Sequence, residues 1–303
     1  HAQDAARMAF GVEHRKESAA GIVDPDGALG NWDYGNYRPL NANTNVTEGF
    51  IETVIPLAKG TEWAKSLDLN ASGRFTSYKT SGFVSTYKFG LTYDPIDDMR
   101  FRITRSRDIR APNLQELFQN GASNTNTVQD RTQPGAPVTT YVGFTVGNPN
   151  LVPEKADTTG LGVVLQPQFF PGFSASIDYF DINISGAIQS VNAQNTLYLC
   201  YAGQSALCGN ITRAAPTAGQ TVGTITLVTS RPTNYLNQIA RGIDFEASYN
   251  INLDEISSSL GGSLTLRGMA NYVKSLRTVG LGVITEGAGV TADRSRGSVS
   301  PAR

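Results

Sequence analysis

The sequence predicts an all-β chain that forms part of an antiparallel, up-and-down transmembrane β-barrel with about ten long strands. Two observations point to this fold class. Apolar and polar residues alternate with period two along ten segments, and the connections between these segments are alternately long and short. A third observation separates the chain from ordinary soluble domains, because only 17% of its residues are charged, against about 25% in such domains.

The clearest alternation runs from Ile239 to Leu253. Its odd-numbered positions are almost all apolar, whereas its even-numbered positions are polar residues, Gly or Ala. Strong versions of this pattern occupy residues 67–75, 83–93, 99–104 and 173–179, and weaker versions occupy residues 6–16, 46–57, 158–166, 221–230 and 260–273. Because successive side chains of a strand point to opposite faces, each segment is expected to form a strand with one apolar and one polar face.

The length of these segments distinguishes a membrane barrel from a soluble β-sandwich, which also alternates. Soluble strands average about 5–6 residues, whereas a tilted strand that crosses a bilayer needs about 9–11. Most of the segments are long enough to cross. Their polar faces carry charged residues that suit a wet or plugged barrel interior better than a dry sandwich core: Arg100, Arg102, Asp244 and Glu246.

The connections support the same interpretation. Long connections are expected at residues 18–45, 108–157, 186–220 and 276–303, and short ones at 58–65, 80–82, 95–97, 168–172 and 254–259. Outer-membrane barrels carry tight turns at one end and long loops at the other. Because each strand crosses from one end of the barrel to the other, successive connections lie at opposite ends. This alternation places all the long connections at the same end. Two details fit less well, because the 80–82 turn falls at the long-loop end and segment 221–230 has to be an excursion within that end.

Composition excludes several other classes of protein. The 25 basic and 26 acidic residues leave a net charge of −1, so nothing favours nucleic acid as a partner. Two histidines and two cysteines are too few for a histidine-based relay or a cysteine-rich metal site, and no Gly-x-Ser-x-Gly motif occurs. We therefore expect no enzyme activity, no cofactor and no metal. No run of about 18 apolar residues is present to form a transmembrane helix.

Two motifs carry a family resemblance. Residues 105–118 read Arg-Ser-Arg-Asp-Ile-Arg-Ala-Pro-Asn-Leu-Gln-Glu-Leu-Phe, and residues 147–158 read Gly-Asn-Pro-Asn-Leu-Val-Pro-Glu-Lys-Ala-Asp-Thr. In this order and spacing they resemble the Arg-Ala-Pro-Asn-Leu-x-Glu-Leu-Phe and Gly-Asn-Pro-Asn-Leu-x-Pro-Glu-Lys segments of TonB-dependent outer-membrane receptors. Residues 163–189 and 242–246 are similar to strands that follow in that family, and the resemblance extends from about residue 5 to 275.

The resemblance implies a domain organisation. Receptors of this family are 22-stranded barrels of the bacterial outer membrane, closed by an N-terminal plug domain. On this basis residues 1–275 are a partial barrel domain with long external loops at about 18–45, 108–157 and 186–236. Residues 276–303 are then a truncated external loop or a disordered tail. The plug domain and the final strands are expected to lie outside this sequence.

The resemblance also implies a function and its partners. The activity is active uptake of a scarce or bulky ligand, such as a siderophore, cobalamin or an oligosaccharide, which the external loops capture. The partners are the TonB complex through an N-terminal region outside this sequence, the plug domain of the same chain, outer-membrane lipid and the ligand. The alternative is a self-contained outer-membrane pore of 10–12 strands with passive diffusion, which leaves the two motifs unexplained.

Two groups of residues are candidate ligand contacts. Trp32, Tyr34 and Tyr37 lie among acids and amides in the first long loop, which suits a sugar or an aromatic chelate and equally suits packing within the loop. The first motif contributes Arg107, Asp108 and Arg110 near the end of a strand. For these three, two roles are open: contact with ligand, or a structural role in fixing where the 108–157 loop leaves and re-enters the sheet.

Cys200 and Cys208 are expected to form a disulfide. They lie eight positions apart in a long loop, and no further metal ligands lie nearby in the sequence. Closing so short a loop would stabilise the folded chain by about 2–3 kcal/mol. A disulfide in an external loop is consistent with an oxidising compartment.

Overall fold

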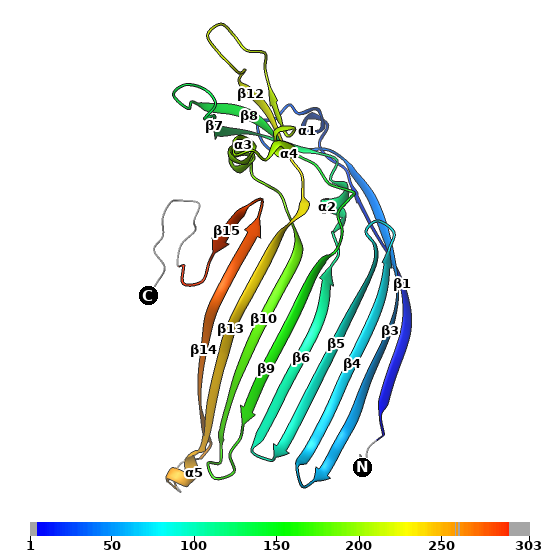
Figure 1. The fold of residues 1–303 in the computed structure, drawn as a ribbon, viewed down its shortest axis with the longest axis vertical. Helices are drawn as coiled ribbons and strands as arrows, with labels where there is room; N and C mark the ends of the chain where they lie inside the picture. Colours follow the sequence, from blue (N-terminus) through cyan, green and yellow to red (C-terminus); the bar gives the residue numbers. More distant parts are fainter. Residues whose placement is uncertain (1–4, 258, 260, 291–303) are drawn as a thin grey trace.

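The computed structural model describes residues 5–257, 259 and 261–290. Within these residues the chain forms a ten-stranded sheet and a separate five-stranded sheet. Figure 1 shows the large sheet as a tall curved wall, with the small sheet and most of the short helices gathered beyond one end of it. We call the large sheet the wall. We call the small sheet and its helices the cap, which comprises residues 22–39, 111–153 and 190–232.

The wall strands are mostly long, and each pairs antiparallel with its neighbours. In spatial order they are β1 (Arg7–Gly21), β3 (Leu40–Thr61), β4 (Ala64–Tyr78), β5 (Gly82–Ile96), β6 (Met99–Arg110), β9 (Glu154–Leu165), β10 (Phe173–Gln189), β13 (Thr233–Asn252), β14 (Ser263–Gly280) and β15 (Val283–Glu286). This order follows the chain, as up-and-down topology requires. The predicted fold class is therefore confirmed.

One of the ten alternating segments, expected to be an excursion at the long-loop end, lies outside the wall. Residues 221–230 contain β12 (Ile225–Ser230), which belongs to the cap, because its side chains Ile225 and Val228 are buried there. The tenth wall strand is instead the short β15, which forms a hairpin with β14. Residues 276–286 thus belong to the β14–β15 hairpin of the wall. Residues 291–303, the rest of the segment expected to be a truncated loop or tail, lie outside the described residues.

The register of the ladders defines two faces of the wall, because cross-strand partners point to the same side. One row consists of Ile103, Leu161, Tyr179, Ile243 and Tyr272. The adjacent row, on the other side, consists of Arg102, Gly162, Asp178, Asp244 and Asn271. We call these sides the apolar face and the polar face. Large side chains of the apolar face are exposed, and Ile103 retains 48% of its accessible surface.

The polar face is tied together by charges that reach across the strands. Arg102 binds Asp178 at 2.7 Å over the intervening Gly162. A Cβ at Gly162 would meet the carboxylate of Asp178, so the glycine makes room for this ion pair. Arg74 likewise binds Glu48 at 2.7 Å, and Glu48 is buried. The pattern of one apolar and one polar face is thus present along the wall.

The connections sort between the two ends of the wall as expected. One end carries the β3–β4, β5–β6, β9–β10 and β13–β14 connections, the last of which contains α5 (Leu253–Ile256). The other end carries the three long connections that build the cap, together with the tight 79–81 turn between β4 and β5 (Figure 1). No helix among the described residues is long and apolar enough to cross a membrane.

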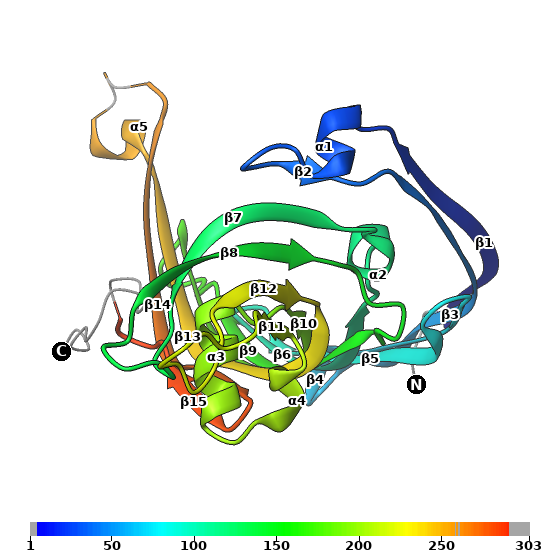
Figure 2. The same ribbon diagram turned by 90° about the horizontal axis from the view of Figure 1, so that it is seen from above.

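The cap sheet draws its strands from three separate loops. Its order is β11 (Ile211–Arg213), β12, β8 (Val138–Thr145), β7 (Ala122–Gln129) and β2 (Asn36–Tyr37). The β8–β12 pair is parallel, and these two strands come from different loops. Short helices accompany the sheet: α1 (Pro25–Leu29), α2 (Leu114–Phe118), α3 (Ala193–Tyr201) and α4 (Ser205–Cys208). Seen from above, the wall follows an arc and the cap strands lie within it (Figure 2).

The buried hydrophobic core of the described residues sits in the cap. Side chains from β7, β8, β12 and α3 pack together there: Val128, Tyr141, Leu197, Ile225 and Val228. The wall has no comparable cluster among the described residues, and β1 and β15 are its two edges, so the sheet is open. The cap is therefore a small folded unit carried on a wall whose apolar face is uncovered.

Candidate functional site

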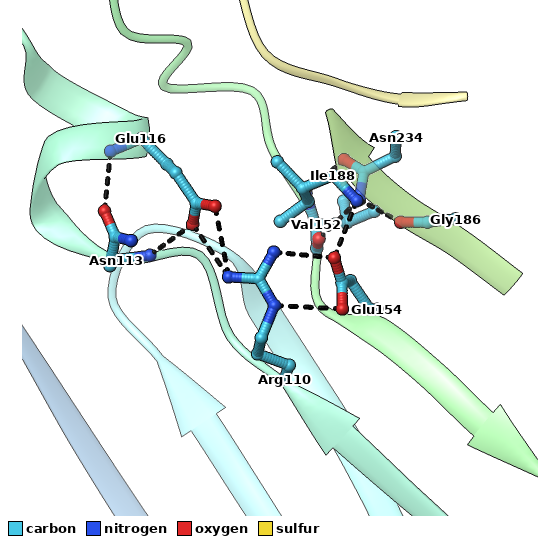
Figure 3. A network of polar contacts seen from close by, with 8 residues as sticks. All are labelled: Arg110, Asn113, Glu116, Val152, Glu154, Gly186, Ile188 and Asn234. Atoms are coloured by element: carbon cyan, nitrogen blue, oxygen red, sulfur yellow. Dashed lines mark hydrogen bonds and ion pairs between the residues drawn. The ribbon is translucent and has the colours of Figure 1, made fainter. Parts of the chain in front are cut away.

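The two sequence motifs meet where the wall joins the cap (Figure 3). Arg110, the last residue of β6, binds Glu154, the first residue of β9, through two hydrogen bonds of 2.6 and 2.9 Å. The same guanidinium donates to the carboxylate of Glu116 in α2 at 3.1 Å. The 111–153 segment therefore leaves and re-enters the wall at one charge-bridged point.

Helix α2 starts directly beyond this point. The side chain of Asn113 accepts a hydrogen bond from the Glu116 amide at 2.7 Å, and the Glu116 carboxylate accepts one from the Asn113 amide at 2.8 Å, which is a capping box. Gly147, in the second motif, packs against the end of this helix and donates to the carbonyl of Gln119 at 2.8 Å. A Cβ at Gly147 would lie 2.6 Å from the Gln119 nitrogen, so no other residue fits there without a backbone shift.

Two further wall strands join the same network. Glu154 accepts a hydrogen bond from the Ile188 amide of β10 at 2.6 Å. The side chain of Asn234 in β13 exchanges hydrogen bonds of 3.0 and 2.8 Å with Val152 and donates to the Gly186 carbonyl at 2.7 Å (Figure 3). We call Arg110, Asn113, Glu116, Glu154 and Asn234 the clamp. The clamp fixes the ends of β6, β9, β10 and β13, which is a structural role for both motifs.

The other two candidates from the first motif are also held by neighbours. Arg107 lies on the apolar face, binds Asp157 through two hydrogen bonds of 2.9 and 3.0 Å, and sits 5.7 Å from the ring centre of Tyr87. Asp108 lies on the polar face and accepts a hydrogen bond from the Ser106 hydroxyl at 2.9 Å. The structure thus places Asp108 and Arg110 on one face of the wall and Arg107 on the opposite face.

The first long loop is a fixed element of the cap. Asp24 caps helix α1 and accepts hydrogen bonds from the Gly27 amide at 2.8 Å and from the Trp32 indole at 3.1 Å. These two hydrogen bonds lower the pKa of the Asp24 carboxyl. The loop is joined to β7 through the Gly35 amide, which donates to the Asn124 side chain at 2.7 Å. Its backbone is therefore held from both sides.

The three aromatic candidates of this loop remain exposed. Trp32, Tyr34 and Tyr37 retain 54%, 75% and 56% of their accessible surface. Apart from the indole bond to Asp24, their rings are not covered by the cap core. Packing within the loop thus uses one edge of Trp32 and leaves three aromatic faces available to a ligand.

A buried ion pair holds the other half of the cap. Asp130, which follows β7, is fully buried and binds Arg213 of β11 at 2.6 and 3.1 Å. It also accepts hydrogen bonds from the amide and the hydroxyl of Thr132. Burial raises the pKa of Asp130, but the hydrogen bonds from Arg213 and Thr132 outweigh it and lower this pKa to about 2. The carboxylate is therefore ionised at neutral pH and joins two loops.

Cys200 and Cys208 form a disulfide in the structure. Their Cα atoms are 5.0 Å apart, and the bond connects α3 to α4. It closes the chain directly beside Tyr198 and Tyr201, which both lie on α3 and are half exposed. The bond therefore restrains the helix that carries these two rings.

A cavity of about 510 Å³ opens at this helix. It is lined by Gln129, Arg131, Gln194, Asn195, Leu197, Tyr198 and Tyr201. Gln194 is fixed by two hydrogen bonds to the backbone of Gln129, at 3.0 and 3.1 Å. Arg131 makes no ion pair within the described part of the chain. The cavity combines a cation, amides and two phenol rings. Sequence reasoning missed it, although the Cys200–Cys208 pair pointed to an ordered structure in this loop.

The described residues contain no group of three or more His, Cys, Asp or Glu that could hold a metal ion. The polar lining of the cavity beside α3 consists of amides, phenols and one arginine. This set of groups can bind a ligand through hydrogen bonds, ring contacts and positive charge.

Comparison with known families gives one match, which covers nearly the whole chain. Residues 3–299 match the model of the family described as TonB dependent receptor-like, beta-barrel. A search of curated proteins returns no match. The family match includes the wall, the clamp and the cap.

Solved structures agree at the level of the fold. A variant of the ferric enterobactin receptor from Pseudomonas aeruginosa, in complex with enterobactin, superposes with a TM-score of 0.60 at 15% identity, over 90% of this chain and 34% of that one. The same receptor in complex with BCV-L6 gives a TM-score of 0.56 at 16% identity, over 88% of this chain and 33% of that one. The chain thus spans about a third of the length of these receptors.

Proposed function

The chain belongs to the TonB-dependent receptor β-barrel family, and from this premise we propose that it is part of an outer-membrane receptor that takes up a siderophore by TonB-driven active transport. Members of this family are transport receptors of the outer membrane, so the chain is not an enzyme. The apolar face of the wall is the face that such barrels present to lipid. The cap then lies at the external end, where ligand arrives.

The observation that carries the proposal is the chemistry gathered on the cap. Three exposed aromatic residues of the first loop and the cavity beside α3 stand on a scaffold fixed by a capping residue, a buried ion pair and a disulfide. Binding sites for small molecules commonly measure about 300–1,000 Å³, and the α3 cavity falls within that range. A rigid support of this kind reduces the ordering that binding requires.

The proposed ligand class follows from the same groups. Arg131, Tyr198 and Tyr201 offer one positive charge and two rings, which suits an anionic aromatic chelate. The structural neighbours cited above are ferric enterobactin receptors. Trp32, Tyr34 and Tyr37 are proposed as further contacts, and Asp108 and Arg110 as supports at the base of the cap. Arg107 stays outside this proposal because it faces lipid. The proposed partners are the TonB complex and a plug domain of the same chain.

The first test measures ligand capture by cells that carry the full-length receptor. The probe is radiolabelled ferric enterobactin, with cobalamin and maltodextrin as competitors. In the Trp32→Ala/Tyr34→Ala variant and in the Tyr198→Ala/Tyr201→Ala variant we expect binding to weaken about tenfold or more, as aromatic contacts at binding sites do. Trp63→Ala is the matched control, because Trp63 is equally exposed but lies at the opposite end of the wall.

Two results would overturn the proposal. Binding as tight as in the wild type in both double variants would show that these cap aromatics do not contact the ligand. Direct binding of labelled cobalamin or maltodextrin, with no binding of ferric enterobactin, would replace the ligand class.

A second test separates the receptor from the passive pore. An uncoupler that collapses the proton gradient should abolish accumulation of the bound probe while leaving its binding to the cell surface intact. Uptake that persists without the gradient would favour passive diffusion. The family match favours the receptor, because it accounts for the two motifs that a pore leaves unexplained.

A further inference from the structure

One strand of the cap sheet, β7, has a side that is only partly covered. In the sheet, β7 lies between β8 and β2, and it has eight residues whereas β2 has two. Figure 2 shows the long β7 and the much shorter β2. Strand β8 pairs with the whole of β7, but β2 pairs only with Ala122 and Ser123. We call the side of β7 that faces away from β8 the β7 edge.

Two contacts outside the ladder close the β7 edge at separate points. At one point the Thr125 amide donates a hydrogen bond to the carbonyl of Asp33 at 2.7 Å. At the other, the side chain of Gln194 accepts a hydrogen bond from the Gln129 amide at 3.0 Å and donates one to the Gln129 carbonyl at 3.1 Å. Gln194 therefore pairs with Gln129 as the backbone of a neighbouring strand would.

Thr127 lies between these two points, and its backbone groups are open. In an antiparallel pair, residues that exchange hydrogen bonds with the partner strand alternate with residues that do not. Because Thr125 and Gln129 both donate away from β8, Thr127 directs its N–H and C=O away from β8 as well. Neither group has a hydrogen-bond partner within the described residues, and Thr127 is exposed. Such unpaired groups are a template for an added strand.

The open part of the β7 edge has room for a short segment only. Thr125 and Gln129 are four residues apart, which is about 14 Å at a strand rise of about 3.4 Å per residue. Asp33 closes this stretch at one end and Gln194 closes it at the other. An added strand therefore fits with about three residues, the central one opposite Thr127. A longer strand of a folded protein would collide with Asp33 or Gln194.

The alternation of side chains along β7 determines where the side chains of such a segment point. Val128 is buried in the cap core together with Leu197 of α3, so a residue opposite Val128 directs its side chain to the α3 side. The cavity beside α3 opens there, because both Leu197 and Gln129 line it. The same cavity holds Arg131, which makes no ion pair within the described part of the chain. A carboxylate on that residue of the segment would meet this cation.

We propose that the β7 edge binds a short extended peptide that pairs with Thr127 and places an acidic first residue in the cavity beside α3. The central residue of the peptide donates its N–H to the Thr127 carbonyl and accepts a hydrogen bond from the Thr127 amide. The peptide runs antiparallel to β7, as β2 does on the same edge, so its first residue lies near Gln129. In peptide recognition by strand addition, main-chain hydrogen bonds give affinity and pockets for alternate side chains give specificity.

This inference goes beyond siderophore capture, because it assigns to the cap a site that recognises a peptide backbone. The two proposals share the cavity beside α3. They differ in Thr127, which has no part in the proposed siderophore site.

The test measures binding of a fluorescent tripeptide to the full-length receptor in detergent. The tripeptide carries Glu, Val and Thr in this order with blocked termini, and fluorescence polarisation follows its titration. A matched tripeptide carries an N-methyl group on the central Val, which removes the donor to the Thr127 carbonyl and keeps every side chain. The N-methylated peptide should bind about tenfold more weakly or worse, as expected when one hydrogen bond is lost and its acceptor is left unpaired. This comparison needs no variant of the receptor.

A pair of variants tests the same contact from the receptor. Thr127→Pro removes the N–H that donates to the peptide, and proline is tolerated on a strand edge where its nitrogen does not serve the ladder. This variant should bind the unmodified tripeptide about tenfold more weakly or worse. The matched control is Thr127→Val, which keeps the backbone groups and the branched shape and should bind as the wild type does. Hydrogen exchange in β8 checks that the cap stays folded in both variants.

A third peptide tests the role of the cavity. Replacing Glu by Gln in the tripeptide removes the charge that faces Arg131 and should weaken binding up to about fivefold, as expected for an ion pair that is accessible to water. Added salt should weaken binding of the Glu peptide more than binding of the Gln peptide.

Four results would overturn the proposal. The tripeptide could fail to bind the wild-type receptor, which is also the result expected if another segment of the receptor covers the β7 edge. The N-methylated peptide could bind as tightly as the unmodified one, or Thr127→Val could lose as much binding as Thr127→Pro. Much tighter binding of a longer peptide with the same three residues at its centre would indicate a protein strand as the partner.

Binding of ferric enterobactin separates the two proposals. A receptor that binds ferric enterobactin but not the tripeptide overturns the peptide site alone. A receptor that binds the tripeptide, with the expected loss on N-methylation, but not ferric enterobactin supports the peptide site and overturns the siderophore proposal.

Discussion

The wall and the cap are both β-sheets, but different interactions hold them. In the wall, each long strand pairs with its neighbour along the chain, and its apolar side chains remain on an outer surface. In the cap, strands from three loops meet, one pair is parallel, and side chains are buried in a core of their own. The cap resembles a small soluble domain in its packing, whereas the wall has its apolar side facing outward.

This difference has a consequence for stability. A wall strand depends on many equivalent backbone hydrogen bonds to its neighbours, so no single side chain dominates. The cap depends on a few contacts between segments that are far apart in the chain, such as Asp130 with Arg213. Single substitutions should therefore unfold the cap locally and leave the hydrogen-bonded wall intact, because local unfolding depends on local contacts.

The largest effect is expected from the buried ion pair. Asp130→Ala leaves Arg213 partly buried without its partner, and removing one member of such a pair costs about 3 kcal/mol or more. Hydrogen exchange of the full-length receptor in detergent should speed up in residues 122–145 and 211–230 and stay unchanged in β4 and β5. The control is Arg131→Met, which removes a neighbouring exposed arginine that makes no ion pair. Equal acceleration in the wall strands would show that the two sheets are not independent.

The second comparison removes the same atoms from each sheet. Ile225→Ala empties part of the cap core, where Ile225 keeps only 1% of its surface, and should destabilise the cap by about 2–4 kcal/mol. Ile103→Ala removes the same atoms from the apolar face of the wall, where lipid or detergent can fill the space, and should cost under about 1 kcal/mol. Hydrogen exchange in each sheet measures both. A larger loss of stability in Ile103→Ala than in Ile225→Ala would contradict the proposed difference between the two sheets.

How far the sequence predicts the structure also differs between the two sheets. Period-two alternation marks nine of the wall strands because one uniform rule, apolar out and polar in, applies along each of them. The cap strands follow no such rule. Residues 122–129 are mostly polar, so alternation does not mark them as a strand. One partner strand, β8, follows in the same loop, but the other, β2, lies more than 80 residues earlier, so local sequence cannot indicate that pairing.

The candidate site also contains parts that the sequence predicts and parts that it does not. The two motifs indicate that the points where the 111–153 segment leaves and re-enters the wall are fixed. The ion pair of Arg110 with Glu154 in the clamp fixes these two points. Which face a residue occupies also follows from parity, which places Arg107 on the apolar face. The cavity beside Tyr198 and Tyr201 has no such signal, because a nine-residue helix is too short to show a clear period. Its position depends on contacts with β7 that only the structure reveals.

The pH dependence of the cap should follow Asp130. Its pKa in the folded chain is about 2, below the ordinary value of about 3.9 for an aspartate. The ionised carboxylate therefore stabilises the cap fully above about pH 4, and this contribution is lost as the pH falls toward 2. Pepsin digestion between pH 4 and pH 2 should cleave the cap progressively faster. Asp130→Asn should digest at a rate that changes much less over this range. A wild-type cap equally resistant at both pH values would contradict the assignment.

The smallest effect is expected at the boundary between the two sheets. Asn113→Ala removes one half of the capping box of α2, which should destabilise the helix start by about 1 kcal/mol. The pair of Arg110 with Glu154 remains, so the loop should still leave the wall at the same point. Hydrogen exchange should rise in residues 114–119 and in neither sheet. Asn120→Ala is the control, since Asn120 follows the helix and makes only a long hydrogen bond of 3.4 Å to Pro39. Faster exchange across the whole cap in Asn113→Ala would show that the clamp transmits disorder from the wall end, and that the cap is less self-contained than its core indicates.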